Sequence, residues 1–340
     1  MLLSLKSVLS NLVFLMDRPK RFICLLASFM LVLGWALPAA AQNFPVKPVR
    51  VLAGFGAGGG SDAMVRLVSA QMASQLGQAV NVENKPSAGS LQAATELASS
   101  PADGYTLFAA DNGMLVYNAA LYKKLPYDSA AFAPIGVMAR TPLMLVASPS
   151  AGFKHVRDML DKAKTAQNKI AYASPGTGSP FHLAMELLKI RAGVQFARVP
   201  FGSDAAALKD VLAGQIDLTV IDLASAMPHI RSGKLQVLAT FSNRRVNAAP
   251  DAPALNELGY KDVESYLWQG LLVSAATPKE IQTRLSQAMQ TAMSQAAVRK
   301  NLPDNGWETL ASDPALMNAF IAADTSVWHR LIKEMGMKLD

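Results

Sequence analysis

Residues 49–67 read VRVLAGFGAGGGSDAMVRL, an apolar run followed by a glycine-rich turn and a helical pattern. Gly54, Gly56 and Gly59 have the spacing G-x-G-x-x-G, and the apolar residues after Ser61 recur every three or four positions, as in an amphipathic helix. A glycine-rich turn that enters a helix leaves backbone N–H groups free at the helix N-terminus, where the helix dipole favours an anion. The stretch therefore predicts an anion-binding turn in an α/β fold.

A second turn of the same kind lies far downstream. The strand AYAS (171–174) enters Pro-Gly-Thr-Gly-Ser179, and a helical pattern follows from Phe181 to Ile190. We expect Ser179 to be the N-cap of that helix. A tight strand-to-helix connection explains either turn alone, but two such turns, one in each half of the chain, predict two lobes that close on one acidic ligand.

Short apolar runs alternate with helical patterns along the chain, which predicts parallel sheets covered by helices on both faces. The predicted strands are 49–55, 78–84, 105–110, 142–148, 169–174, 194–201, 216–222, 234–242 and 270–275. The predicted helices are 61–76, 91–100, 155–164, 181–190, one capped by Ser203 and ended by Gly214, 225–233, one opened by a capping box at Thr277-Pro-Lys-Glu280, and 314–335.

The chain opens with an export signal. Basic residues precede an unbroken apolar run at 22–37, and small residues that end at Ala41 follow it, as at a signal peptidase site. The run is short for a membrane span of about 20 residues, which makes a retained anchor the less favoured alternative. We therefore predict a signal peptide at 1–41, a mature chain that begins at Gln42 and a periplasmic location. Translation starts at Met1 or at Met16.

Composition excludes several classes of protein. Cys24, the only cysteine, lies in the export signal, so the mature chain has no disulfide and no Cys-ligated metal. The formal net charge is +7, but no run of Lys or Arg is interleaved with aromatic residues, so we expect no nucleic-acid partner. The four histidines lie far apart without HxH or HExxH spacing, which argues against a zinc site.

The main alternative is a dinucleotide-binding oxidoreductase, because Glu83 follows the glycine motif near the position of a ribose-binding acid. The motif alone is weak, and nicotinamide cofactors are not supplied outside the cytoplasm. We expect no cofactor, no metal and no enzymatic activity. The motif G-x-S-x-G is absent around Ser179. His182 points into the cleft or packs against its own lobe, and Asp222 either faces a ligand at the end of its strand or caps the next helix.

Several sequence motifs of the chain resemble those of a known protein family. The motifs VENKPSAG, PADGYTL, ALYKKLPYD, YASPGTGSPFHLAMEL, LAGQIDL, MPHIRSGKL and WQG are similar to those of the Bug family, the extracytoplasmic solute receptors of tripartite tricarboxylate transporters. The resemblance implies a type II periplasmic-binding-protein fold, in which two α/β lobes are joined by crossing hinge strands with the ligand cleft between them. Lobe 1 is expected at 42–142 plus 267–340, and lobe 2 at 143–266.

The resemblance also implies a site and a ligand class. Family members bind small carboxylates (organic acids, acidic amino acids or aromatic acids), held largely by backbone amides and water. The expected ligand-binding residues are Phe55, Ala57, Gly58, Gly59, Ser61, Asp62, Asn112, Ser174, Gly176, Thr177, Gly178, Ser179, His182 and Asp222. Phe55, Phe181 and Trp268 are candidate apolar walls or core residues. We expect a monomer that hands its ligand to a membrane permease; a ligand sensor that docks on a signalling partner is the alternative.

Overall fold

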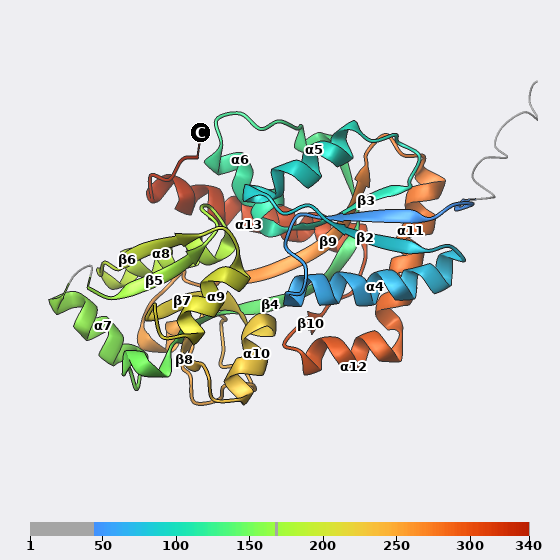
Figure 1. Cartoon of the computed structure of the whole chain (residues 1–340). Helices are drawn as coiled ribbons and strands as arrows, with labels where there is room; N and C mark the ends of the chain where they lie inside the picture. Colours follow the sequence, from blue (N-terminus) through green and yellow to red (C-terminus); the bar gives the residue numbers. More distant parts are fainter. Residues whose placement is uncertain (1–43, 167–168, 340) are drawn as a thin grey trace, which may run out of the picture. The chain divides into compact units, whose positions relative to one another are not determined.

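The computed structural model describes residues 44–166 and 169–339, and residues 45–340 form one compact unit (Figure 1). Its strands are β1 (Val49–Ala53), β2 (Val80–Asn84), β3 (Thr106–Asp111), β4 (Phe132–Ala147), β5 (Ala171–Pro175), β6 (Ala197–Phe201), β7 (Leu218–Asp222), β8 (Gln236–Thr240), β9 (Tyr266–Ser274) and β10 (Glu308–Thr309). Its helices are α4 (Gly60–Leu76), α5 (Leu91–Ser99), α6 (Asn118–Leu121), α7 (Val156–Thr165), α8 (Pro180–Ala192), α9 (Asp204–Leu212), α10 (Leu223–Arg231), α11 (Lys279–Ser294), α12 (Ala296–Asp304) and α13 (Pro314–Glu334).

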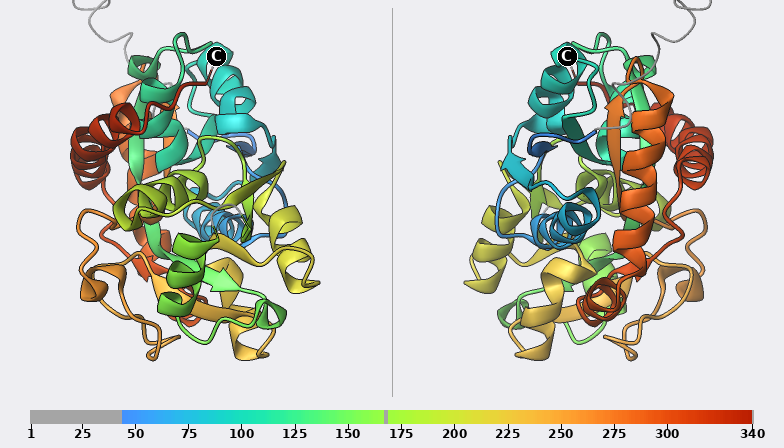
Figure 2. Two further views of the ribbon diagram at one scale, coloured as in Figure 1. Left: turned by 90° about the vertical axis from the view of Figure 1, so that its left-hand side faces the viewer. Right: turned by 90° about the vertical axis from the view of Figure 1, so that its right-hand side faces the viewer.

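A first sheet follows the strand order β2-β1-β3-β9-β4, with β10 on β4. β1 pairs in parallel with β2 and with β3, while β9 runs antiparallel to both β3 and β4. The apolar side chains of β1 and β3 are buried, as expected of strands covered on both faces. α11 packs along α4 beside this sheet, and α13 packs against β4 (Figure 2).

A second sheet is built on the far end of β4. Residues 132–142 of β4 pair with β9, whereas residues 143–147 pair antiparallel with β7 and β8. β5 then pairs in parallel with both β7 and β6. One face of this sheet holds a core that includes Met144, Val211 and Ile221. Since one strand enters both sheets, the molecule has two α/β lobes joined through β4 and β9.

The structure corrects two predicted strands and one predicted cap. β4 begins at Phe132 instead of 142, and β9 begins at Tyr266 instead of 270. The strand pairs are antiparallel around β4 and β9, not parallel throughout. The capping box at Thr277 is wrong: Pro278 occupies the N-cap position of α11 without a side-chain cap, and Thr277 Oγ1 is buried without a partner. The helix starts one residue too late for the Thr277 hydroxyl to reach its amides.

Two predicted caps are confirmed. Ser203 Oγ accepts from the Ala206 amide at the start of α9, and Ser179 Oγ accepts from the His182 amide at the start of α8. The export signal and its cleavage site lie outside the described residues. Within residues 44–166 and 169–339, no helix is both long and apolar enough to cross a bilayer.

Candidate functional site

No side chain caps the N-terminus of α4, which follows the first predicted turn. Gly59 is the N-cap residue, with extended dihedral angles (φ −82°, ψ 173°), and has no side chain to accept from the first turn. The first four N–H groups of an α-helix have no acceptor within the helix, so the amides of Gly60 and Ser61 remain available. Together with the helix dipole, they form an anion-binding end.

The turn that leads into α4 is held in place by Asp62. Its carboxylate accepts from the Gly58 amide at 2.9 Å, from Arg66 Nε at 2.9 Å and from Asn84 Nδ2 at 2.9 Å. Burial alone raises the pKa of Asp62, but these hydrogen bonds together hold it below the ordinary value. Asp62 and the Gly58 amide are therefore occupied with shaping the turn.

The two remaining predicted residues of this turn, Phe55 and Ala57, contribute little side-chain structure. The Phe55 carbonyl accepts from Asn84 Nδ2 at 3.1 Å, which ties the turn to the end of β2, and its side chain is half-buried. Ala57 is exposed. The turn therefore presents backbone, not side-chain, groups to its surroundings.

Gln269 and Asp111, which we did not predict, adjoin this helix end. Gln269 Nε2 donates to Ser61 Oγ at 2.6 Å, and Gln269 Oε1 is buried without a partner. Asp111 lies opposite Gln269 in the antiparallel pair of β3 with β9, so the two side chains share one face. The Asp111 carboxylate accepts from the Met114 amide at 2.9 Å, and burial raises its pKa.

Asp111 also lies where the two lobes meet. A Cβ built on Gly113 would lie 3.0 Å from Asp111 Oδ1 and 3.2 Å from Pro180 Cδ at the start of α8. Gly113 thus lies between the Asp111 carboxylate and Pro180, which comes directly after the second glycine-rich turn. The rule that placed Asp222 in the predicted site, an acid at the carboxyl end of a strand, applies equally to Asp111 and was the available signal.

The second turn, 174–179, is braced by its own lobe. The Gly176 amide donates to the Phe201 carbonyl at 3.0 Å, and the Gly178 amide donates to His182 Nδ1 at 3.1 Å. Arg198 Nη2 donates to Thr177 Oγ1 at 2.7 Å, which brings a cation next to the turn that the sequence did not suggest. Ser174 Oγ is buried without a partner.

His182 has partners at both ring nitrogens within its lobe. Nδ1 accepts from Gly178, and Nε2 lies 3.6 Å from Glu186 Oε1. Burial, reinforced by the charge of Arg198, lowers the pKa of His182 to about 4, so the ring is neutral at ordinary pH. Glu186 is itself bound by Tyr172 and Lys189, each at 2.7 Å. In this arrangement His182 orients the second turn.

Asp222 and Asn112 are both buried at strand ends. Asp222 Oδ1 accepts from the Ser225 amide at 2.8 Å and so caps α10, one of the two expected roles. Burial raises the pKa of Asp222 to about 6, with a smaller contribution from Asp204. Asn112 Nδ2 donates to the Tyr266 carbonyl at 2.9 Å and to the hydroxyl of Tyr117 at 2.8 Å, and its Oδ1 has no partner.

The lobes touch at helix starts. A Cβ built on Gly60 would lie 3.0 Å from Ala224 Cβ at the start of α10, and one on Gly178 would lie 2.8 Å from Leu121 Cδ1. A cavity of about 430 Å³ adjoins the first turn, where Gly58 and Gly59 face Asp204. No residue of 174–179 lines it. This cavity therefore adjoins the first turn and not the second.

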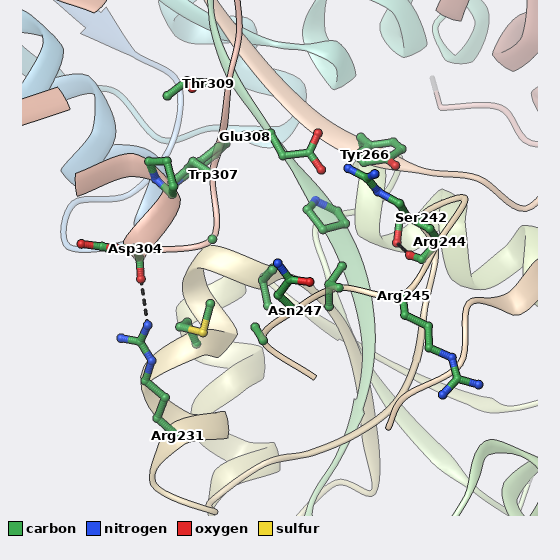
Figure 3. Close-up of a pocket in the computed structure, with 17 residues that line it drawn as sticks. Arg231, Ser242, Arg244, Arg245, Asn247, Tyr266, Asp304, Trp307, Glu308 and Thr309 are labelled. Atoms are coloured by element: carbon green, nitrogen blue, oxygen red, sulfur yellow. Dashed lines mark hydrogen bonds between the residues drawn. The ribbon is translucent and has the colours of Figure 1, made fainter. Parts of the chain in front are cut away.

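A larger cavity, of about 830 Å³, lies against the crossing strands and contains none of the predicted residues (Figure 3). Tyr266, Trp307 and Glu308 line it, and Arg231 Nη2 donates to the Asp304 carbonyl at 2.9 Å at its edge. Trp268, a candidate ligand wall or core residue, is 1% exposed, packs on Phe320 and donates to Asp324. The described residues contain no group of acids, histidines or cysteines able to hold a metal ion.

Comparison with known proteins decides the family. Residues 64–337 match the family model described as tripartite tricarboxylate transporter family receptor. The chain belongs to this family. It is 31% identical to a UPF0065 protein of Bordetella pertussis, over 89% of this chain and 94% of the relative. It is also 28% identical to the protein BugT of the same organism, over 94% of this chain and 98% of the relative.

Solved structures agree with the fold. A Rhodopseudomonas palustris protein with adipate has a TM-score of 0.82 at 28% identity, covering 87% of this chain and 99% of that chain. MatC of the same organism, with bound malate, has a TM-score of 0.80 at 29% identity, covering 85% and 100%. The receptor therefore has the type II periplasmic-binding-protein fold, and its role is solute binding, as the Bug resemblance implied.

Proposed function

We propose that this receptor captures a small carboxylate in the periplasm and hands it to a membrane permease of the tripartite tricarboxylate type. The ligand is an organic acid, an acidic amino acid or an aromatic acid. The observation that carries the proposal is the uncapped start of α4, where free amides and the Ser61 hydroxyl meet the buried Gln269 amide. Adipate and malate in two similar receptors support the same ligand class.

A thermal-shift screen across organic acids tests the ligand class. A ligand present at 100 times its dissociation constant stabilises the folded state by about 2.7 kcal/mol, which is readily measured. We expect monocarboxylates or dicarboxylates to raise the melting temperature. Stabilisation by neutral sugars alone would contradict the proposal.

The proposal includes a location and a division into lobes. We place the mature N-terminus at Gln42, which N-terminal sequencing of exported protein tests. We place lobe 1 at 42–142 plus 267–340 and lobe 2 at 143–266. The change of pairing partner along β4, from β9 to β7 and β8 after Pro142, supports this boundary.

Delivery to a permease is the proposed role, with the receptor acting as a monomer. Uptake of the labelled acid should require both the receptor and the permease genes. Uptake that persists without the receptor would instead favour the sensing role.

A further inference from the structure

The helix starts around the lobe junction differ in whether a side chain caps them. Ser179 caps α8, Asp222 caps α10, and Asp111 accepts from the Met114 amide at the helical turn after β3. The start of α4, after Gly59, has no side-chain cap. The chain therefore supplies its own carboxylates to the helical turns after β3 and β7, whereas the first amides of α4 have no side-chain acceptor and are available to the carboxylate of a ligand.

Beside this anion-binding end lies a polar group that nothing in the described chain satisfies. Gln269 is fully buried, and one end of its amide reaches Ser61 Oγ in the first turn of α4. The other end has no partner. A buried polar atom without a hydrogen bond costs about 1–3 kcal/mol, so a ligand that supplied a partner to this atom would gain from that contact.

The next group along the same face is an acid. Asp111 is partly exposed, lies opposite Gln269, and has no ion pair within the described residues. Of the cations beside the two turns, Arg66 binds Asp62, and Arg198 donates through Nη2 to Thr177 of the second turn, while its Nε is buried without a partner. Burial raises the pKa of Asp111, as expected of a carboxylate that lacks a positive partner.

Asn112, the next residue along the chain, has a buried acceptor on the opposite side, towards Tyr117 and Tyr266. Asn112 donates through Nδ2 to the Tyr266 carbonyl, which can only accept, so the unpartnered atom of its amide is the oxygen. On the α4 side, the groups thus change from the backbone donors of α4 to the carboxylate of Asp111. A dicarboxylate would place its second charge against Asp111, whereas a ligand with a cationic donor would satisfy it.

We infer that the ligand is an α-amino acid, whose carboxylate binds the amides at the start of α4 while its ammonium group donates to Asp111. This inference rests on the proposed function and narrows it. The Gln269 side-chain amide lies between the two charged ends of the amino acid. If the unpartnered atom of this amide is the oxygen, it accepts from the ammonium group of the ligand. If that atom is the nitrogen, it donates to the carboxylate of the ligand. A hydroxy acid supplies a donor as well, but it leaves the charge of Asp111 uncompensated.

Matched ligand pairs test the inference by calorimetry on the mature protein. The amino acids L-leucine, L-phenylalanine and L-glutamate are compared with their deaminated analogues, 4-methylpentanoate, 3-phenylpropanoate and pentanedioate. We expect at least one amino acid to bind at least tenfold more tightly than its analogue. Asp111→Asn keeps a good helix cap and should remove most of that preference. Asp161→Asn, at a position whose side chain is 75% exposed, should keep it.

The outcomes separate the inference from the proposed function. If the deaminated acids bind as tightly as the amino acids, the inference is wrong and carboxylate capture stands. A preference for amino acids that survives Asp111→Asn also overturns the role of Asp111. If no carboxylate of either kind binds or stabilises the protein, both the inference and the proposed function fail.

Discussion

Asp222 illustrates at the residue scale how a buried charge sets the pH dependence of stability. Burial raises its pKa from 3.8 to about 6 in the folded protein, so the folded state holds the proton more tightly than the unfolded chain. The contribution of this group to stability is therefore largest below pH 4 and falls as the pH rises to about 6. At neutral pH the ionised form costs on the order of 3 kcal/mol.

Replacing Asp222 by Asn should raise stability at neutral pH. Asn caps helices as well as Asp and carries no charge, so we expect a melting temperature a few degrees above that of the parent at pH 7.5. The difference should shrink to zero below pH 4. Melting curves between pH 3.5 and 8 measure this, with Asp128→Asn, an exposed cap that accepts from Ala130, as the control. A variant less stable than the parent at pH 7.5 would show that the Asp222 charge is stabilised by its surroundings.

Single residues were predictable where the chemistry is local. Ser179 and Ser203 were expected as caps because a hydroxyl directly before a helical pattern reaches the amides of the next turn. Asp111 and Gln269 were not predicted, since their meeting depends on the pairing of β3 with β9, two strands far apart in the sequence. Local patterns carry no information on which strand ends become neighbours.

At the scale of elements, the close approach of α4 to α10 allows the closing of the two lobes on a ligand to be disturbed without disturbing the folding of either lobe. A Cβ built on Gly60 would lie 3.0 Å from Ala224 Cβ and 3.4 Å from the Ser225 amide nitrogen. Those atoms belong to the other lobe, so a larger side chain at Gly60 obstructs the junction without disturbing either core. Gly60 thus allows the start of α4 to lie against the start of α10.

We expect Gly60→Val to weaken ligand binding by at least tenfold while the melting temperature of the ligand-free protein stays within a few degrees of the parent. The added methyl groups must push α10 away, and the lobes then cannot close fully on a ligand. Calorimetry and melting curves measure the two effects. Gly202→Ala, where no atom lies within 4 Å of the added Cβ, is the control. Unchanged affinity in Gly60→Val would mean that this contact plays no part in capture.

The crossing strands β4 and β9 were the elements predicted least accurately from the sequence. β4 contains Pro134 and Gly136, and its pairing with β9 shifts register there, so its first half reads as a loop. β9 is buried along most of its length because helices and the other lobe surround it, which removes the alternation that marks a half-covered strand. Regular strands with a helix after them, such as β1 and β5, were recognised.

At the scale of the whole molecule, the lobes are joined through β4 and β9, and β9 also carries Gln269 of the candidate site. Gln269 lies on one face of β9 towards α4, whereas its neighbour Trp268 lies on the other and donates to Asp324 at 2.7 Å. The cavity of Figure 3 is lined from both sides of the crossing, by Leu223 and by Trp307. The fold class was predictable because sequence motifs of the family are distributed along the whole chain. The geometry at the junction of the two lobes was not predictable.

The central claim is that backbone amides at the start of α4, and not a cationic side chain, hold the ligand carboxylate. A crystal structure of the mature protein with a carboxylate identified by thermal shift tests this most directly. We expect a carboxylate oxygen about 2.7–3.2 Å from the amide nitrogens of Gly60 and Ser61. A carboxylate bound instead to the guanidinium of Arg198, or seated against Arg244 in the cavity of Figure 3, would contradict it.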